Sequence, residues 1–166
     1  MRREHLHLTA FLTALGGAAA LIVALASERW GGLVPCALCL VERWPYRVVI
    51  VLGLIGSLTP RPASRVLLWL AVVTLLAGAA LGGLHVGVEQ GLWKSPLPEC
   101  AAPHISTGSL SQMLASMPAR PSKPCDAPTY LIPGLPLSMA AMNMIYALVF
   151  AAVLATSLLQ RRRRWG

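Results

Sequence analysis

Long apolar runs alternate with more polar segments along the 166 residues of the chain. Each run is about 20 residues long, the length at which an α-helix crosses the roughly 30 Å core of a bilayer. Backbone N–H and C=O groups in lipid must bond within their own segment, which favours helices over open strands. The pattern therefore predicts four transmembrane helices, at residues 8–27, 40–58, 66–88 and 137–159.

The connections between these runs are of very unequal length. They comprise residues 28–39, 59–65 and 89–136, followed by a tail at 160–166. Within the runs, small residues recur at four-residue spacing, as at Gly78 and Gly82, and small side chains let helices pack closely in lipid. We expect a single all-α integral membrane domain over residues 1–166, folded as an antiparallel bundle of four transmembrane helices.

The long connection is rich in Pro, Ser and Gly, so most of it should be irregular. Its segment SLSQMLASM, residues 109–117, is an exception, because apolar residues recur there at the i, i+3, i+4, i+7 spacing of one helix face. These residues are Leu110, Met113, Leu114 and Met117. The spacing favours a short amphipathic helix lying on the membrane surface, although a loop that happens to carry apolar residues fits it equally well.

Composition and charge place the chain in a membrane and indicate its orientation. Hydrophobic residues make up 56% of the sequence and charged residues 12%, about half the charged share of a soluble domain. The net charge of +8 does not indicate a nucleic-acid partner, because arginines gather at residues 2–3, 61–65 and 161–164, on one side of the predicted bundle. The positive-inside rule puts that side, with both termini, in the cytoplasm. The peptide ALA at 24–26 resembles a signal-peptidase site, but the apolar run before it is longer than that of a signal peptide, which favours a retained helix.

The four cysteines, Cys36, Cys39, Cys100 and Cys125, all fall in the connections assigned to the outer side. Thiols outside the cytoplasm can persist as disulfides. Four cysteines allow three pairings, and the spacing favours one of them. Cys36 and Cys39 can pair across a single helical turn, which leaves Cys100 and Cys125 to close a loop.

The spacing of the cysteines also distinguishes the kinds of chemistry they can support. A zinc site prefers two close pairs, whereas the second pair here is 25 residues apart. A purely structural C-x-x-C bridge closes too small a loop to stabilise a fold much. Tight C-x-x-C pairs are typical of redox chemistry, with the pKa of one thiol lowered by its surroundings. Two disulfides in series would pass electrons to the membrane edge, where an acceptor dissolved in lipid is the natural sink.

The residues after the C-x-x-C pair place charge at the start of the second apolar run. A helix N-terminus carries about half a positive charge, which favours a thiolate at Cys36 or Cys39. Arg43 follows Cys39 by one helical turn on the same face, where its guanidinium would stabilise a thiolate or donate to an oxygen-bearing ligand. Glu42 would pair with Arg43 or with Arg47, and Arg47 is otherwise typical of a side chain that reaches to the lipid headgroups.

The segment PCALCLVERWPYR, residues 35–47, resembles the P-C-x-L-C-x-x-[EQ]-R-x-P-Y signature of the bacterial DsbB family of membrane disulfide-bond formation proteins. The resemblance extends over nearly the whole chain, through the predicted helices, the second cysteine pair in the long outer loop and the two cytoplasmic ends. It implies a protein of the bacterial inner membrane that oxidises a periplasmic thioredoxin-fold partner of the DsbA type. It also implies that the electrons pass to ubiquinone, or to menaquinone without oxygen.

The same resemblance implies roles for the residues at the matching positions. Cys100 would form the mixed disulfide with the partner, and Cys125 would go on to attack Cys36. Cys39 would be the thiolate that meets the quinone ring, and Arg43 would hold a quinone carbonyl oxygen. No metal is implied.

Further polar residues are implied near the quinone, namely Glu42 within the signature and the pair Glu89 and Gln90 after the third predicted helix. The chain departs from the family after Cys125. Family members commonly carry an aromatic-rich W-x-F-L-G-L-like run there, whereas this chain has TYLIPGLPLSMAAMN. The docking of residues 126–136 on the partner or the membrane is therefore less defined than the thiol chemistry.

Two alternatives differ from this interpretation in cysteine order or in class. The vitamin K epoxide reductase type also uses a C-x-x-C pair and a loop pair with quinone, but there the C-x-x-C follows the loop cysteines, whereas here it precedes them. A non-enzymatic membrane scaffold or metal-handling protein with structural disulfides is the alternative from another class. Bound quinone in the purified protein, with an absorbance change on reduction, would distinguish the enzyme from the scaffold.

Overall fold

The computed structural model describes residues 2–100, 109, 111, 123–132 and 134–163. The helices are α1 (Arg2–Arg29), α2 (Ala37–Val41), α3 (Arg43–Leu58), α4 (Arg61–Glu89), the 3-10 helix η1 (Pro98–Cys100) and α6 (Met139–Arg163). Among the described residues there is no β-strand, and bridging of the β type is limited to two isolated pairs. The prediction of an all-α protein is confirmed for this part of the chain.

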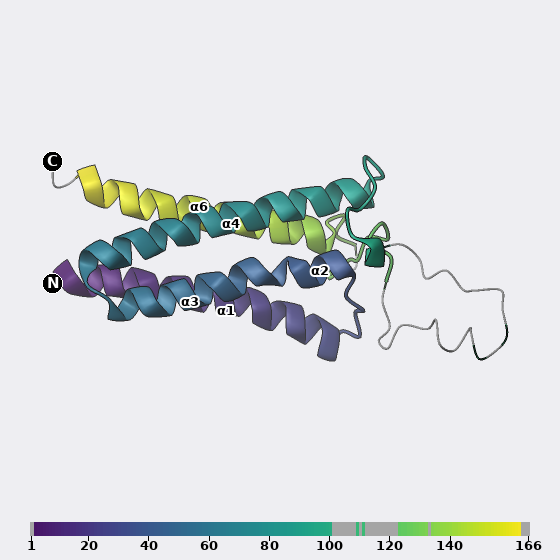
Figure 1. Cartoon of the computed structure of the whole chain (residues 1–166), viewed down its shortest axis with the longest axis horizontal. Helices are drawn as coiled ribbons and strands as arrows, with labels where there is room; N and C mark the ends of the chain where they lie inside the picture. The colour runs from purple at the N-terminus through teal and green to yellow at the C-terminus, as the bar shows by residue number, and fades with distance from the viewer. Residues whose placement is uncertain (1, 101–108, 110, 112–122, 133, 164–166) are drawn as a thin grey trace.

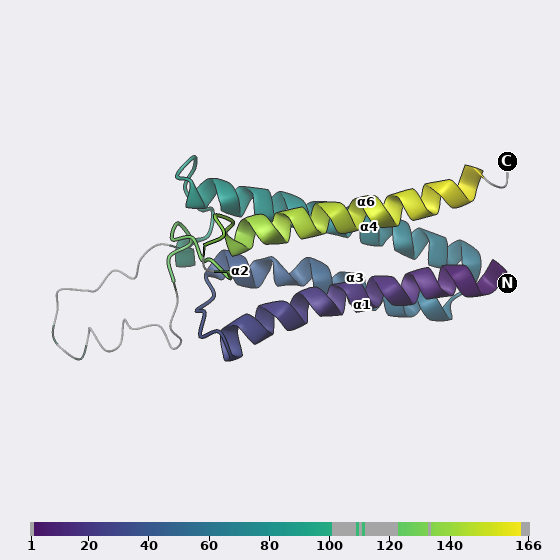
Figure 2. The same cartoon turned by 180° about the vertical axis from the view of Figure 1, so that it is seen from behind.

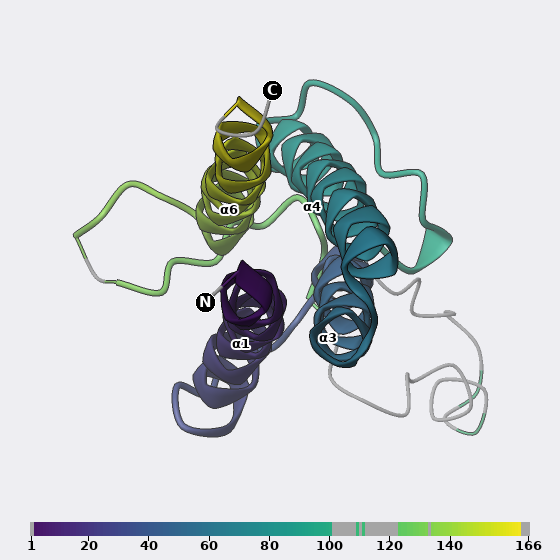
Figure 3. The same cartoon turned by 90° about the vertical axis from the view of Figure 1, so that its left-hand side faces the viewer.

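The long helices α1, α3, α4 and α6 lie side by side along the long axis of the molecule (Figure 1, Figure 2). The end-on view shows them arranged around a common centre (Figure 3), with α3 packed against α1 and α4, and α4 packed against α6. The N-terminus, the C-terminus and the α3–α4 connection lie at one end, which we call the terminal end (Figure 1). The short helices α2 and η1 lie at the other end, which we call the cysteine end.

The interior along the helices is built from aliphatic side chains. Val49 of α3, Leu68 and Leu75 of α4, and Leu158 of α6 are at most 1% exposed and belong to one buried cluster. This cluster contains buried side chains from α1, α3, α4 and α6. Their removal from the surroundings holds the four long helices together along their inward faces.

Glycines allow the helices to approach one another closely. A Cβ atom at Gly82 would lie 3.0 Å from Cβ of Met144 on α6, and one at Gly78 would lie 3.1 Å from Cβ of Pro45 on α3. The prediction that these two spaced glycines face neighbouring helices is confirmed. Gly53 of α3, which the pattern did not single out, lies closer still, because a Cβ there would come within 2.7 Å of the α1 backbone.

Within the described residues, three helices are long and apolar enough to cross a membrane. They are His5–Arg29, Arg61–Glu89 and Met139–Gln160. Only 22%, 39% and 22% of the residues in their most apolar stretches are buried inside the protein, so most of these side chains face outward. Apolar side chains exposed over such a length require lipid rather than water around them.

The second predicted helix, residues 40–58, is divided in the structure. α2 ends at Val41, Glu42 forms a turn, and α3 then runs for 16 residues from Arg43. Pro45 explains the division, because its nitrogen has no proton to donate to the carbonyl of Val41 four residues earlier. α3 alone is shorter than the about 20 residues of a full crossing, so its length does not establish the expected fourth span.

The long connection returns to the cysteine end. There Lys123 forms a parallel β-bridge with Cys36, which brings the returning chain beside the start of α2. The predicted amphipathic helix at residues 109–117 lies outside the described residues, apart from Ser109 and Ser111.

Candidate active site

The C-x-x-C pair begins α2, as its predicted position at a helix start requires. Cys36 is the N-cap residue, with φ −84° and ψ 171°, and its Sγ accepts a hydrogen bond from the backbone N–H of Cys39 at 3.2 Å. The two Sγ atoms lie 2.7 Å apart and share a hydrogen bond. A small further approach would give the S–S bond length of about 2.05 Å. The pair is therefore reduced in this structure but is placed to form a disulfide.

The surroundings shift the pKa values of the two thiols of this pair in opposite directions. The hydrogen bond with Cys39, aided by the contact with His85, lowers the pKa of the Cys36 thiol to about 4 in spite of its burial. The same hydrogen bond, together with burial, raises the pKa of the Cys39 thiol. These directions favour Cys36 as the thiolate of the reduced pair, at the helix N-terminus. The role of Cys39 as the thiolate that meets the quinone stays a prediction.

The arrangement of donor atoms around the pair fits redox chemistry better than metal binding. The ligand atoms of Cys36, Cys39 and His85 lie within 4.8 Å of one another. Two thiolates on one zinc ion, with Zn–S bonds of about 2.3 Å, would lie about 3.8 Å apart in tetrahedral geometry. The two Sγ atoms are much closer, at 2.7 Å. The absence of a metal stays a prediction, and this spacing is in its favour.

A chain of polar side chains leads from Cys36 into the bundle. Nε2 of His85 lies 3.5 Å from Sγ of Cys36, and Nδ1 lies 2.7 Å from Oε1 of Glu42. The other carboxylate oxygen of Glu42 accepts from Nδ2 of Asn143 on α6 at 2.8 Å. The Tyr46 hydroxyl of α3 donates to Oδ1 of Asn143 at 2.5 Å. His85 and Glu42 are 2% and 6% exposed, so loss of a partner would leave a buried polar group unsatisfied.

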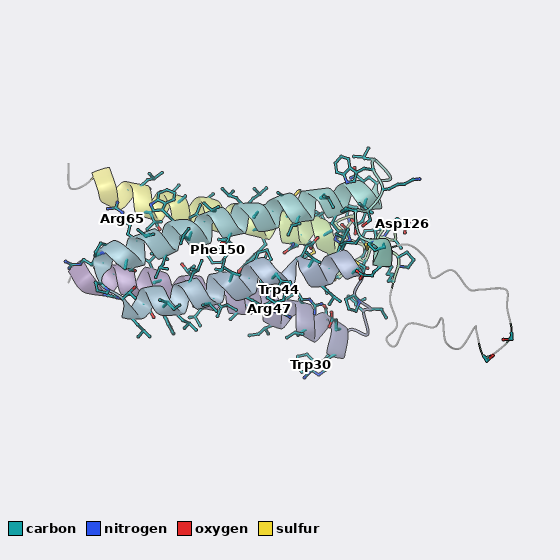
Figure 4. The ribbon with its side chains drawn as sticks, in the orientation of Figure 1. Trp30, Trp44, Arg47, Arg65, Asp126 and Phe150 are labelled. Carbon is teal, nitrogen blue, oxygen red and sulfur yellow. A yellow bond between two sulfur atoms is a disulfide. The ribbon has the colours of Figure 1, made fainter. Side chains whose placement is uncertain are left out.

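The second cysteine pair belongs to the same buried cluster. Cys100 and Cys125 form a disulfide and are 6% and 1% exposed. They pack with Cys36 and with apolar side chains of α2 and α4. Figure 4 shows Asp126, the chain neighbour of Cys125, at this end of the molecule. The pairing favoured by the spacing is confirmed for Cys100 and Cys125, and both pairs meet at the cysteine end.

Arg43, the predicted quinone contact, occupies the first position of α3 and forms an ion pair with Glu28 of α1. The two side chains are 11% and 24% exposed, so the pair is largely covered. Glu28 was not identified from the sequence, because it falls in the predicted connection at 28–39 with no motif around it, whereas in the structure α1 continues to Arg29. Arg47 lies over the ring of Trp44, 4.9 Å from the ring centroid (Figure 4). The two arginines of this helix therefore have different surroundings.

Glu42 does not pair with an arginine, and the predicted pairing with Arg43 or Arg47 is wrong. The turn between α2 and α3 directs its carboxylate toward α4 and α6. His85 and Asn143 on those helices bond both of its oxygens. In place of the predicted ion pair, the structure has a buried carboxylate that accepts hydrogen bonds.

Glu89 and Gln90 lie at the end of α4. Oε2 of Glu89 accepts a hydrogen bond from the Ser138 hydroxyl at 2.5 Å, which ties the end of α4 to the start of α6. Gln90 is the C-cap residue of α4, and its backbone N–H donates to the carbonyl of Val86. The expected place of both residues near a quinone stays a prediction.

Comparison with protein families supports the chemistry indicated by the cysteines. The family model described as "Disulfide bond formation protein DsbB" matches residues 6–157. The chain belongs to the DsbB family. It is a disulfide-bond-forming membrane protein with membrane-spanning helices.

Two relatives of this DsbB family member carry the name of a disulfide bond formation protein, and a third is uncharacterized. A "Disulfide bond formation protein B" from Azoarcus sp. (strain BH72) is 30% identical over 156 residues, which cover 88% of this chain and 87% of the relative. The protein of the same name from Herminiimonas arsenicoxydans is 28% identical over 79 residues, which are 48% of this chain and about half, 50%, of that relative. "Uncharacterized protein RP370" from Rickettsia prowazekii (strain Madrid E) is 30% identical over 116 residues, 67% of this chain and 63% of that relative. No solved structure matches the chain.

Three members of the polar chain, His85, Asn143 and Tyr46, were not identified as site residues from the sequence. A usable signal existed for His85 and Asn143, because ionisable and amide side chains are rare inside apolar runs and usually face the interior of a bundle. The sequence could not predict that their side chains meet at Glu42, because packing against neighbouring helices sets how each helix is rotated about its axis.

Proposed function

We propose that this DsbB family member reoxidises a periplasmic dithiol oxidase of the thioredoxin fold, of the DsbA type, and passes the electrons to membrane quinone. The observation that carries the proposal is the single buried cluster that holds the Cys100–Cys125 disulfide and Cys36, with Cys39 packed against it. Thiol–disulfide exchange requires sulfur atoms that can reach one another, and this cluster supplies them at one end of the bundle.

The exchange runs inward through the two pairs, and each step forms one S–S bond and breaks one. A thiolate of the reduced partner attacks Cys100, forms the mixed disulfide and releases Cys125 as a thiolate. Cys125 then attacks Cys36 of the oxidised C-x-x-C pair, and the electron pair of the broken bond leaves on Cys39. The second thiol of the partner attacks the partner sulfur bonded to Cys100, which completes the partner disulfide and frees Cys100. Two electrons have then moved from the partner into the protein.

The side chains around the C-x-x-C pair fit a quinone at the membrane edge. Arg43 has five N–H donors, and its bond to Glu28 leaves others for a carbonyl oxygen. Cys39 is partly exposed whereas Cys36 is buried, which suits Cys39 to meet an acceptor that arrives from lipid. Ubiquinone or menaquinone, when bound, would accept two electrons and two protons from the dithiol. The other proposed neighbours of the quinone are Glu42, Glu89 and Gln90.

The proposed orientation puts the cysteine end in the periplasm and both termini in the cytoplasm, within the bacterial inner membrane. Its support is the distribution of charge, because the start of α4, which carries Arg61 and Arg65, lies with the α3–α4 connection at the terminal end, away from the cysteines (Figure 1). In this arrangement α2 and α3 together serve as the fourth crossing, with the break at Glu42 near the periplasmic surface. The amphipathic helix at 109–117 remains part of the proposal.

Proteoliposomes that contain the purified protein, with ubiquinone, with menaquinone or without quinone, test this function. A reduced thioredoxin-fold partner should lose its free thiols only when quinone is supplied. His7→Gln, a change at the terminal end, should behave like the parent protein. Thiol loss that is independent of quinone would overturn the electron path. Absence of thiol loss with thioredoxin-fold partners would overturn the assignment of the partner.

A further inference from the structure

His85 connects the reduced cysteine pair to a buried carboxylate. Its Nδ1 faces Oε1 of Glu42 at 2.7 Å, and its Nε2 faces Sγ of Cys36 at 3.5 Å. A carboxylate accepts hydrogen bonds, so Glu42 holds the imidazole proton on Nδ1 and turns the lone pair of Nε2 toward the sulfur. An imidazole in this orientation is placed to take the proton of the Cys36 thiol.

We propose that His85, held by Glu42, is the acid–base group that keeps the proton of Cys36 on Nε2 and so makes Cys36 a good leaving group in disulfide exchange. This inference rests on the proposed function, because it assigns a role within that exchange. The site then contains, besides the cysteines that carry electrons, a histidine that carries only a proton.

The step concerned is the one that restores the state seen in the structure. After the inward attack, Cys125 is bonded to Cys36. The Cys100 thiolate attacks Cys125, the Cys100–Cys125 bond forms, the Cys36–Cys125 bond breaks, and the electron pair leaves on the Cys36 sulfur. A leaving thiol with a low pKa departs faster, and Cys36 has a lowered pKa. The products are a Cys100–Cys125 disulfide and a free Cys36, which is the arrangement observed.

The protons of the reduced pair also balance in this scheme. A dithiol that holds two electrons holds two protons, and here one proton lies on Cys39, whose pKa is raised. The other lies on His85 rather than on Cys36. The imidazolium of His85 then sits between two negative groups, the thiolate of Cys36 and the carboxylate of Glu42. Such placement between opposite charges favours the charged imidazole.

The groups around His85 are compatible with a proton held there. Cys36 and Cys39 at the start of α2, Glu42 in the turn, Tyr46 of α3 and Lys123 of the returning loop are titratable or charged. The other charged groups of α3 and α4 at this end have partners elsewhere: Arg43 pairs with Glu28, Arg47 lies over Trp44, and Glu89 accepts from Ser138. Asn143 of α6 donates to Glu42 and stabilises the carboxylate as an anion. The Lys123 ammonium donates to the carbonyl of Pro128 and the hydroxyl of Thr129, within the loop itself.

The experiment is a pH titration of thiolate ultraviolet absorbance in the reduced, full-length protein in detergent, without partner or added quinone. The Cys36→Ser protein is titrated in parallel, so that the low-pH absorbance step lost in that variant identifies the titration of Cys36. His85→Gln should raise the midpoint of the titration by about one pH unit or more, which is about tenfold less thiolate below the midpoint, because an amide cannot hold the proton. His7→Gln is the matched control, since His7 bonds a backbone carbonyl at the terminal end, and it should leave the midpoint unchanged.

An unchanged midpoint in His85→Gln would overturn the inference. If that variant does not fold, Glu42→Gln decides, because it keeps the shape of the carboxylate and removes its charge. A raised midpoint then supports the inference, and an unchanged one overturns it. The titration contains neither partner nor quinone. Failure of the proteoliposome test with a raised midpoint would therefore remove the proposed function alone, and the reverse result would remove only the role of His85.

Discussion

The two ends of the bundle use polar side chains in different ways. At the terminal end, His7 bonds the carbonyl of Ser57 and Arg65 donates to a backbone carbonyl of α6, so each side chain makes a separate contact with a neighbouring helix. At the cysteine end, His85 is bonded through both ring nitrogens and continues into Glu42 and the helices beyond it. A separate contact joins two helices, whereas a connected chain of side chains also holds a proton in a defined place. Substitutions at the two ends test whether this difference is functional.

Serine at Cys36 or at Cys39 should have the largest effect. Either change removes an electron-carrying sulfur from the cysteine end, so quinone-dependent oxidation of the partner should fall to background. Helical content, measured by circular dichroism, should stay close to that of the parent, because serine is similar in size to cysteine. Ser57→Ala at the terminal end is the control and should keep full turnover. Normal turnover in either cysteine variant would contradict the assignment.

Cys100→Ser should abolish the covalent link to the partner. The Cys100–Cys125 disulfide is the pair next to the long loop, and the proposed first attack falls on Cys100. A partner with a single reactive cysteine should therefore form a mixed disulfide with the parent, seen as a larger band on a non-reducing gel, and none with this variant. Trapping at Cys39 and never at Cys100 would reverse the order of the two pairs.

The sequence predicted the apolar helices better than the polar contacts between them, for physical reasons. A bilayer demands about 20 apolar residues per crossing, so the predicted helices at 8–27, 66–88 and 137–159 correspond to long helices of the structure. The helix predicted at 40–58 is divided at Glu42. The missing N–H of Pro45 accounts for the break, and this signal lies in the residue type itself rather than in the average hydropathy of the run.

The cysteines could be assigned because their chemistry depends on residue type and spacing. The partners of Glu42 and Arg43 could not, because they depend on the rotation of each helix within the bundle. His85 is 43 residues from Glu42 and Glu28 is 15 residues from Arg43, each on another helix, and close packing decides which faces meet. Spacing in the sequence predicts which side chains are neighbours within one helix, but not which side chains of another helix they contact.

Arg43→Ala tests whether a polar contact near the cysteine end serves the quinone. A hydrogen bond to a charged group contributes about 1.5–3 kcal/mol. Its loss should lower kcat/KM for quinone by about 10- to 150-fold and raise the apparent KM. Arg43→Lys should recover part of the loss, because an ammonium lacks the planar fork of a guanidinium. Steady-state kinetics at varied quinone concentration gives both values.

The matched control for Arg43 is Arg47→Ala. Arg47 lies on the same helix but over the Trp44 ring, so its loss should leave quinone kinetics unchanged. If both variants reduce the folding yield and leave quinone kinetics unchanged, Arg43 serves with Glu28 only to hold α3 against α1.

Tyr46 and Tyr146 pack against each other and allow a comparison of the two kinds of polar contact within one place in the bundle. Tyr46 and Tyr146 lie with ring centroids 6.0 Å apart. The hydroxyl of Tyr46 donates to the side chain of Asn143, whereas the hydroxyl of Tyr146 donates at 2.9 Å to the backbone carbonyl of Gly16. One tyrosine therefore ends the polar chain of the cysteine end, and the other makes a separate contact of the kind seen at the terminal end.

Tyr46→Phe and Tyr146→Phe should each lower the free energy of unfolding by about 0.6–1.5 kcal/mol, the range of one hydrogen bond in such a setting. Tyr46→Phe should also raise the thiolate midpoint of Cys36 by a few tenths of a pH unit, about twofold in thiolate, because it weakens the support of Glu42 and hence of the His85 proton. Tyr146→Phe should leave that midpoint unchanged, since its bond does not lead to Glu42. The absorbance titration and chemical denaturation in detergent measure the two effects separately. Equal midpoints in the two variants would confine the functional chain to His85 and Glu42, and Tyr46 would then act on stability alone.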